Sequence, residues 1–265
     1  MVNSGAGPPM KAGSDFRLRL ASGAEDRLAA QRLRYEVFVA ELGSQGEGVD
    51  HSLRLETDRF DAVASHLMLE DHAVDGAPIL AATTRLITQD QARRVGGFYS
   101  ESEYDLERLT TSGRRVMELG RTCLRRDYRG GAAMFHLWHG LARHVLETET
   151  DLLFGVASFH GTDIAALAQP LSLLHYRHLA PTDLRPAARP PGAQRMNLLE
   201  EAELDRKAAM LATPALIKAY LRLGAMTGDG AFIDHDFNTT DVCLIVDLNL
   251  LSERQKAIYL KDLDA

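Results

Sequence analysis

Cysteine and tryptophan are scarce in this chain, which has two cysteines and one tryptophan among 265 residues. Two cysteines cannot form the disulfide framework of a small secreted domain. Cys123 and Cys243 both stand in apolar, strand-like runs, so we expect reduced, buried thiols. No run of about 18 apolar residues is present, so the sequence predicts no membrane-spanning helix.

An excess of positive charge is also missing, because 37 acidic residues outnumber 30 basic ones. The formal net charge of −7 argues against general nucleic-acid binding and leaves only local basic patches for an anionic partner. The N-terminal residues lack the apolar core of a signal peptide, so we expect a cytoplasmic protein. Residues 1–13 are rich in glycine, proline, serine and alanine and are expected to form a disordered tail.

The apolar pattern predicts a mixed α/β protein. Helices are expected at 24–42, from 133 onward, and at 162–168, and a further helix begins at Thr213–Pro214. A proline-rich stretch at 180–191 divides an expected core, residues 14–180, from a C-terminal extension, residues 181–265, which has enough apolar surface to pack on that core. The expected strands lie at 16–20, 65–70, 79–87, 116–124, 152–159 and 242–248.

A strand, a turn and a helix follow one another over residues 116–144, and the turn reads R-x-x-R-G-G-A. Glycines let backbone N–H groups approach an anion, and a helix N-terminus adds partial positive charge. We therefore expect a phosphate site, although a Gly-Gly pair before a helix is more often only a turn. The residues expected to form this phosphate site are Arg126, Tyr128, Arg129, Gly130, Gly131 and Ala132.

A second stretch, E-T-D-R-F-D at residues 56–61, concentrates three carboxylates. Such a stretch is a solvated loop in most proteins. A carboxylate in such a stretch can, however, also act as a general base that accepts a proton from a substrate, directly or through one water. The alternative is that the carboxylates only pair with arginines, which we expect for at least two of Glu56, Asp58, Asp61 and Glu118.

Four spacings occur in a recognisable order. Arg34 and Phe38 form R-x-x-x-F, residues 56–61 form E-x-D-x-F-D, Arg85 opens R-L, and Glu118 with Arg121 forms E-x-x-R. This order resembles the acyl-homoserine lactone synthases. The resemblance is closer to the ornithine lipid N-acyltransferases (L-ornithine Nα-acyltransferases), through E-L-G-R at 118–121, R-x-x-Y-R-G-G at 125–131 and D-F-N-T-T-D-V at 236–242.

The resemblance implies a fold of the GCN5-related N-acyltransferase (GNAT) type, a mixed central sheet flanked by helices. It implies direct transfer of a 3-hydroxyacyl chain from acyl carrier protein to the α-amine of L-ornithine, with no further cofactor, no metal and no nucleic acid. It also implies peripheral contact with the inner face of the cytoplasmic membrane, for which the first helix is a candidate surface. The expected catalytic residues are Glu56, the first choice as base, with Asp58, Asp61 and Glu118, and the expected substrate-binding residues are Arg34, Phe38, Arg85 and Arg121.

Several alternatives stay open at this point. Lactone synthases usually carry a tryptophan soon after R-x-x-x-F, whereas the one tryptophan here is Trp138. A lactone synthase using S-adenosylmethionine, an acylating enzyme for another amino acid such as glutamine, and a catalytically silent acyl-carrier or membrane-binding module remain alternatives. Cys123 has no histidine at short spacing to activate it as a nucleophile. A zinc site is not expected, because no acidic or cysteine ligand is suitably spaced from His66, His136, His139 and His144.

Overall fold

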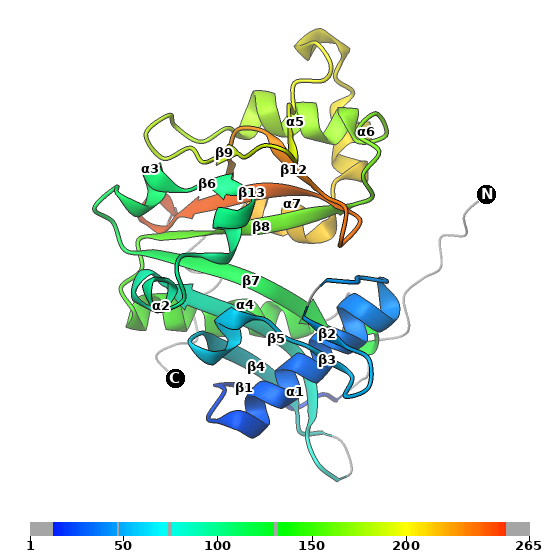
Figure 1. Cartoon of the computed structure of the whole chain (residues 1–265), viewed down its shortest axis with the longest axis vertical. Coiled ribbons are helices and arrows are strands. Elements are labelled where there is room, and N and C mark those ends of the chain that lie inside the picture. Colours follow the sequence, from blue (N-terminus) through cyan, green and yellow to red (C-terminus); the bar gives the residue numbers. More distant parts are fainter. Residues whose placement is uncertain (1–12, 47, 74–75, 130–131, 253–265) are drawn as a thin grey trace, which may run out of the picture. The chain divides into compact units, whose positions relative to one another are not determined.

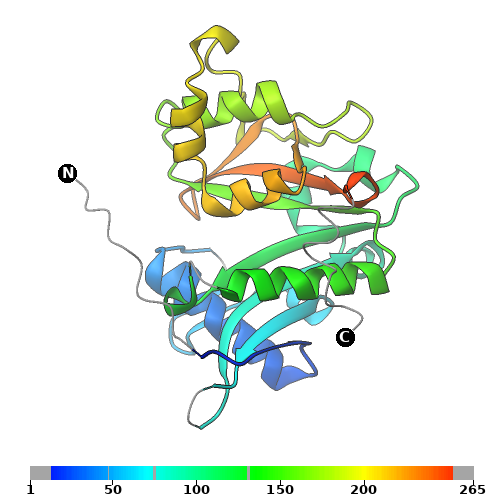
Figure 2. The same ribbon diagram turned by 180° about the vertical axis from the view of Figure 1, so that it is seen from behind.

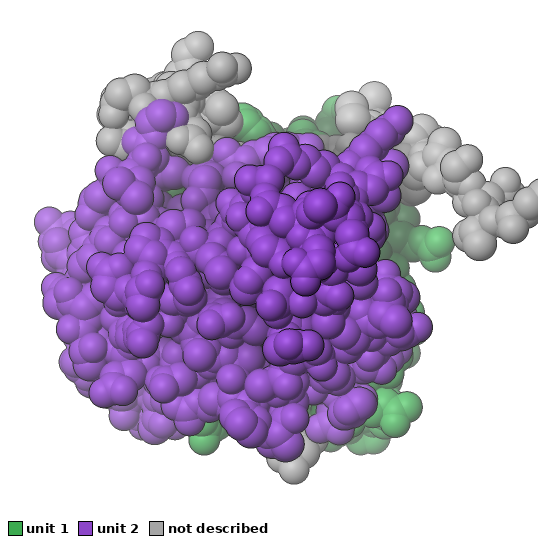
Figure 3. Space-filling model, turned by 90° about the horizontal axis from the view of Figure 1, so that it is seen from above, with its two compact units in different colours: residues 1–86, 120–148, 258–265 green, residues 87–119, 149–257 purple. Residues whose placement is uncertain are grey.

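The computed structural model describes residues 13–46, 48–73, 76–129 and 132–252. The chain forms two compact units that interleave along the sequence, coloured separately in Figure 3. Unit 1 holds residues 1–86, 120–148 and 258–265, and unit 2 holds residues 87–119 and 149–257. The boundary at residue 180 that we expected from the sequence stays a prediction. Of the expected disordered tail, residues 1–12 lie outside the described residues.

The strands of unit 1 follow the order β1, β4, β5, β7. They span Phe16–Leu20, Ser65–Asp71, Ile79–Thr88 and Val116–Leu124, with the end of β5 and the start of β7 counted in unit 2. β4 pairs antiparallel with both β1 and β5. All four strands were predicted from the apolar pattern within about two residues. Two short strands, β2 (Val49–Asp50) and β3 (Leu55–Glu56), form a separate hairpin.

Two helices cover opposite faces of these strands (Figures 1 and 2). On one face lies α1 (Ala24–Arg34), whose Asp26 binds Arg19 of β1. On the other lies α4 (Ala132–Glu147), where Gly140 sits so close to β1 that a Cβ would overlap the Leu18 side chain. A larger residue at position 140 would therefore force the end of the Leu18 side chain to move.

The first helix continues from α1 into a π-helical segment, η1 (Tyr35–Glu41). π-helical turns are rare and often occur at functional sites. Tyr35 and Val37 are buried, so the surface suggested for membrane contact belongs to the core instead. Among the described residues, no helix is both long and apolar enough to cross a membrane.

The strands of unit 2 follow the order β7, β8, β13, β12, β10, and β11 also pairs with β13. β8 (Leu152–His160) pairs parallel with β7 only at the start of both strands, but it pairs antiparallel with β13 (Thr239–Asp247) along its whole length. The helix expected at 162–168 is wrong. The Asp163 carboxylate there accepts the N–H groups of Ala165 and Ala166 in a turn, and α5 begins only at Ala168.

The remaining elements of unit 2 are short. Figure 2 shows α7 (Ala215–Arg222) in front of β8 and β13. The others are α2 (Gln89–Arg94), η3 (Tyr99–Ser102), β6 (Tyr104–Asp105), α3 (Glu107–Thr110), α5 (Ala168–His178), β9 (Ala187–Ala188), β10 (Ala193–Gln194), η5 (Glu201–Glu203), α6 (Arg206–Ala212), β11 (Met226–Thr227), β12 (Ala231–Asp234) and η6 (Leu248–Leu250).

Candidate active site

Three arginines meet three carboxylates in unit 1, so their formal charges balance. The carboxylates come from β3 and from the 3₁₀ turn η2 (Arg59–Ala62), and the arginines come from the end of α1, from β5 and from β7. We call this set the Arg–carboxylate cluster. Its members are Arg34, Arg85, Arg121, Glu56, Asp58 and Asp61.

Asp61 is the most firmly bound carboxylate of the cluster. Both nitrogens of the Arg34 fork donate to its two oxygens, at 2.7 and 2.6 Å, and Gln31 Nε2 donates at 2.9 Å. Burial alone would raise the pKa of Asp61, but the hydrogen bonds and charge of Arg34 outweigh it and hold that pKa well below its usual range. Sequence reasoning missed Gln31, although it precedes Arg34 by one helical turn and therefore shares its face.

Glu56 lies between two arginines. Its Oε2 forms an ion pair with Arg34 Nε at 2.6 Å, and its Oε1 accepts from Arg121 Nε at 3.1 Å. Its side chain is 3% exposed. A carboxylate with both oxygens occupied by arginines in a buried position is well suited to hold those arginines in place.

Asp58 has a different environment. Both of its oxygens lie 2.5 Å from Arg85 Nη1, and Oδ1 also caps η2 by accepting from Phe60 N at 2.9 Å. Its contact with Arg121 Nη2 is loose, at 3.7 Å. The side chains of Asp58 and Arg121 are 18% and 14% exposed, whereas the other four members are at most 4% exposed. The loosest ion pair is therefore the one that solvent reaches.

The backbone at Arg121 is strained. This residue has φ of 51° inside β7, a conformation that non-glycine residues seldom adopt. Such outliers persist where surrounding contacts hold them, and they concentrate at functional sites. Here Glu56 holds the Arg121 side chain.

Glu118 and Phe38 lie outside the cluster. The Glu118 carboxylate belongs to unit 2, where it accepts Tyr99 N at 2.8 Å and Ser100 N at 2.7 Å and so caps the start of η3. Phe38 packs against the apolar group of Leu33, Val37 and Cys123. The residues chosen from the order of the motifs therefore include all six members of the Arg–carboxylate cluster. They also include Glu118 and Phe38, which contact other parts of the chain.

The turn after β7 is partly anchored to its own unit. Tyr128 is buried, and its hydroxyl donates to Asp71 Oδ2 at 3.0 Å. The Arg129 fork binds the Glu41 carboxylate at 2.6 and 2.8 Å. Arg126 is exposed, and Ala132 is the first residue of α4. Gly130 and Gly131 lie outside the described residues.

Neither the thiols nor the histidines form a second reactive centre among the described residues. Burial raises the pKa of the Cys123 thiol to about 12, so it stays protonated and is a poor nucleophile. Burial lowers the pKa of His66 and keeps it neutral. The residues closest to a cation site are Glu103, Asp234 and Asp241 of unit 2, with one carboxylate oxygen each within 4.8 Å of the others. Three carboxylates alone do not identify a metal site.

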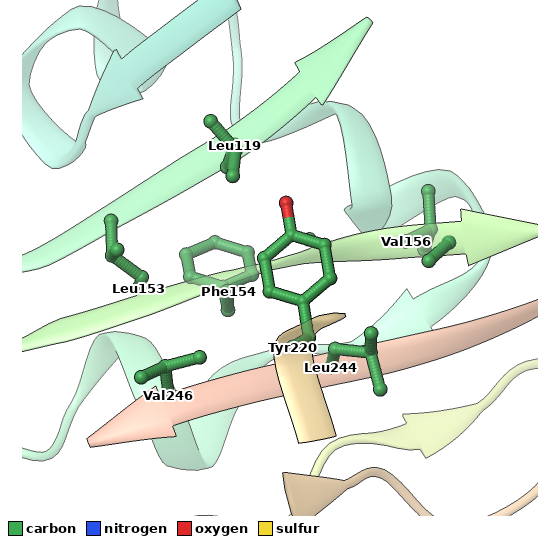
Figure 4. A pocket seen from close by; sticks show the side chains of 9 residues that line it. Leu119, Leu153, Phe154, Val156, Tyr220, Leu244 and Val246 are labelled. Atoms are coloured by element: carbon green, nitrogen blue, oxygen red, sulfur yellow. The ribbon is translucent and has the colours of Figure 1, made fainter. Parts of the chain in front are cut away.

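Unit 2 contains an apolar pocket, shown in Figure 4. Tyr220 of α7 extends its ring toward the strands and supplies the phenol of an otherwise apolar lining. Gly155 of β8 lies against the backbone of Leu119, and a Cβ there would collide with the Leu119 carbonyl oxygen. The lining residues are Leu119, Leu153, Phe154, Gly155, Val156, Ala157, Tyr220, Leu244 and Val246.

Comparison with known proteins assigns the family. Residues 33–139 match the model of an acetyltransferase (GNAT) domain. The chain is 52% identical to the L-ornithine N(alpha)-acyltransferase of Rhodobacter capsulatus over 92% of this chain and 94% of that protein. It is 39% identical to the protein of the same name from Brucella abortus, over 92% of this chain and 88% of that protein.

A solved structure supports the fold. The CoA-dependent acyl-homoserine lactone synthase BjaI, with SAM and isopentyl-CoA, aligns with a TM-score of 0.53 at 13% identity, over 95% of this chain and 90% of that one. At this identity the likeness concerns the fold, which is the mixed sheet with flanking helices that the sequence predicted. The chain is an acyltransferase with a GNAT fold and belongs to the L-ornithine N(alpha)-acyltransferase family.

Proposed function

We propose that this chain transfers a 3-hydroxyacyl chain from the phosphopantetheine of acyl carrier protein to the α-amine of L-ornithine, yielding a lyso-ornithine lipid. The observation that carries the acceptor assignment is the 52% identity to a relative named L-ornithine N(alpha)-acyltransferase, nearly end to end. The acyl donor and the roles of individual residues rest on the arguments that follow.

The exposed part of the Arg–carboxylate cluster suits an amino acid. An amino acid presents a carboxylate beside an ammonium, and Arg121 and Asp58 present the opposite charges 3.7 Å apart. In this proposal the α-carboxylate binds the Arg121 guanidinium and the α-ammonium binds Asp58, so the substrate replaces a loose ion pair with two charge-assisted contacts. Arg34, Arg85, Glu56 and Asp61 then keep Arg121 and Asp58 in position.

Asp58 is the base in this scheme, in place of Glu56. The α-ammonium gives its proton to the Asp58 carboxylate, directly or through one water. The freed amine attacks the thioester carbonyl and forms a tetrahedral intermediate. As the C–S bond breaks, the phosphopantetheine thiolate takes up the surplus proton of the attacking nitrogen, which leaves the neutral amide and a thiol. The exposure of the two side chains supports this choice, because the Asp58 side chain is 18% exposed and that of Glu56 is 3% exposed.

Chemical arguments support the proposed acyl donor. The apolar lining of the small pocket in unit 2 is proposed to contact part of the hydrocarbon chain, with Tyr220 at its wall. The turn at residues 126–132 is proposed to hold the phosphate of the phosphopantetheine arm, with Arg126 as its exposed charge. The product is an amphiphile, so we also propose peripheral contact with the inner face of the cytoplasmic membrane.

A product analysis tests the proposal. Purified protein is incubated with a 3-hydroxyacyl thioester of acyl carrier protein and one acceptor at a time: L-ornithine, L-lysine, L-glutamine or S-adenosylmethionine. Mass spectrometry should find an amide with ornithine. Nδ-acetylornithine should still be acylated and Nα-acetylornithine should not. A lactone from S-adenosylmethionine, or an amide with glutamine alone, would refute the acceptor assignment, and transfer only from the coenzyme A thioester would refute the carrier.

A further inference from the structure

The turn after β7 carries three arginines, and two of them are bound by one helical segment. Arg125 Nη1 lies 2.7 Å from Glu36 Oε2, and its Nε donates to the Leu80 carbonyl at 2.9 Å. The Arg129 fork binds Glu41 through both nitrogens, at 2.6 and 2.8 Å. Glu36 and Glu41 both belong to η1. The two ends of the turn are therefore attached to the same π-helical segment.

The third arginine, Arg126, has no such side-chain attachment among the described residues, although its charge helps Arg129 to lower the pKa of Glu41. Its side chain is exposed and forms no ion pair or hydrogen bond with the part of the chain that the structure describes, while its backbone carbonyl accepts from Arg129 N at 3.3 Å. Tyr128 is turned inward and donates to Asp71. Of the three arginines, Arg126 thus has its charge available to an anion from solvent, while Arg125 and Arg129 are already neutralised by glutamates.

We infer that Glu36 and Glu41 are positioning residues for the acyl donor: by holding Arg125 and Arg129, they present Arg126 to the phosphate of the phosphopantetheine arm. This inference rests on the proposed function of the turn as the phosphate site. It also explains why η1 carries acidic residues beside a site that must attract an anion, an arrangement that long-range electrostatics alone would disfavour.

Neutralising Glu41 should change the KM for the acyl donor in the opposite direction from the one that simple charge attraction predicts. Neutralising Glu41 removes a negative charge near the phosphate site, so charge attraction alone predicts a lower KM for the acyl donor. If Glu41 positions the turn, the same change raises that KM. Since partly exposed ion pairs are individually weak, we expect a rise of roughly two- to fivefold.

The experiment compares Glu41→Gln and Glu36→Gln with Glu149→Gln, which breaks an exposed Arg–Glu pair with Arg115 at 2.5 Å on unit 2. KM is measured separately for the 3-hydroxyacyl thioester of acyl carrier protein and for ornithine, together with kcat and Tm. We expect the acyl-donor KM to rise in the two η1 variants alone, with kcat and the ornithine KM unchanged. An acyl-donor KM that is unchanged or lower in Glu41→Gln overturns the inference.

Two further variants distinguish an error in the proposed phosphate site from an error in the proposed role of Glu41. Arg126→Ala should raise the acyl-donor KM by about tenfold or more, because it removes a charge-assisted contact to phosphate. If it does not, the proposed phosphate site itself is wrong. In the charge swap Glu41→Arg with Arg129→Glu, the acyl-donor KM should return toward the wild-type value. If instead Arg129 contacts the phosphate, the swap will be at least as impaired as Arg129→Glu alone.

Discussion

Replacing Asp58 by asparagine should slow catalysis far more than it unfolds the protein. Asparagine keeps the size of the side chain and an oxygen that can still accept from Phe60 N, now at 2.9 Å, so the cap of η2 survives. The change removes the negative charge that faces Arg85 Nη1 at 2.5 Å and Arg121 Nη2 at 3.7 Å. The substrate ammonium thereby loses its proposed proton acceptor.

The two expected effects differ in size. General-base help is typically worth about 10²–10⁴ in rate, so kcat should fall by at least about 100-fold. The cost in stability should be smaller, about 1–3 kcal/mol, because it is that of one lost charged hydrogen bond. Arg85 also keeps its contact with Asp61 at 3.2 Å and its place over the Phe60 ring. For a chain of this size the change in Tm should be roughly 3–10 °C.

Asp61→Asn is the matched control, since it removes one carboxylate charge from the same cluster. It breaks the buried two-point contact with Arg34 and should cost about 3–5 kcal/mol of stability. The folded fraction should nevertheless lose far less kcat than Asp58→Asn does, because Asp61 only keeps neighbouring side chains in position and has no proposed role in proton transfer. Glu56→Gln, the variant that the sequence put first, is measured beside both.

The assay follows release of the carrier thiol with both substrates saturating, over a pH range from neutral to alkaline. Asp58→Asn should recover activity as pH rises, because more of the ornithine amine is then neutral without help. A folded Asp58→Asn enzyme with near-normal kcat at neutral pH would refute the assignment. If Glu56→Gln then shows the loss and the alkaline rescue, Glu56 is the base.

Three shorter predictions concern other parts of the chain. Cys123→Ser should retain substantial activity, and intact-protein mass spectrometry during turnover should find no acyl-enzyme, since the protonated thiol is not a nucleophile; a thioester on Cys123 would disprove direct transfer. Gly155→Ala should lower Tm, measured by calorimetry, because its Cβ meets the Leu119 carbonyl oxygen; an unchanged Tm would contradict the close approach. The lowered pKa of Asp61 stabilises the fold above the ordinary aspartate pKa of about 3.9, and this contribution is lost as pH falls below it; the Tm of Asp61→Asn should therefore depend less on acid pH than that of the wild type, and equal dependence would argue against it.

The strands could be predicted from sequence because each has a clear apolar pattern, and β7 (Val116–Leu124) begins and ends where the pattern indicated. Most of the cluster could also be anticipated, because the order of the motifs brought Arg34, Glu56 and Asp61 together. Glu118 could not be assigned in the same way. Side chains alternate along a strand, so residues three apart, such as Glu118 and Arg121, point to opposite faces in a regular strand.

The burial and the ion-pair partners of the site residues could not be predicted from the sequence. The motif E-x-D-x-F-D does not distinguish Glu56 from Asp58. Both oxygens of Glu56 are paired with arginines and its side chain is buried, whereas the Asp58 side chain is partly exposed to solvent. The ion pairs could not be predicted either, because partners such as Arg129 and Glu41 are 88 positions apart in the sequence. Such contacts depend on how helix and turn pack, which no local spacing encodes. The expected helix at 162–168 failed for a local reason, since the Asp163 side chain closes a turn where the apolar pattern suggested a helix.

The pairing of β8 with β13 also matters during synthesis. Thr239, the first residue of β13, leaves the ribosome about 80 residues after His160, the last residue of β8. At about 5–20 residues per second, β8 waits roughly 4–16 s with one edge unpaired, and its apolar edge is a template for aggregation during that time. The speed of translation between residues 160 and 239, and chaperones that cover nascent strands, should therefore influence the yield of folded enzyme more than the stability of the finished protein would suggest.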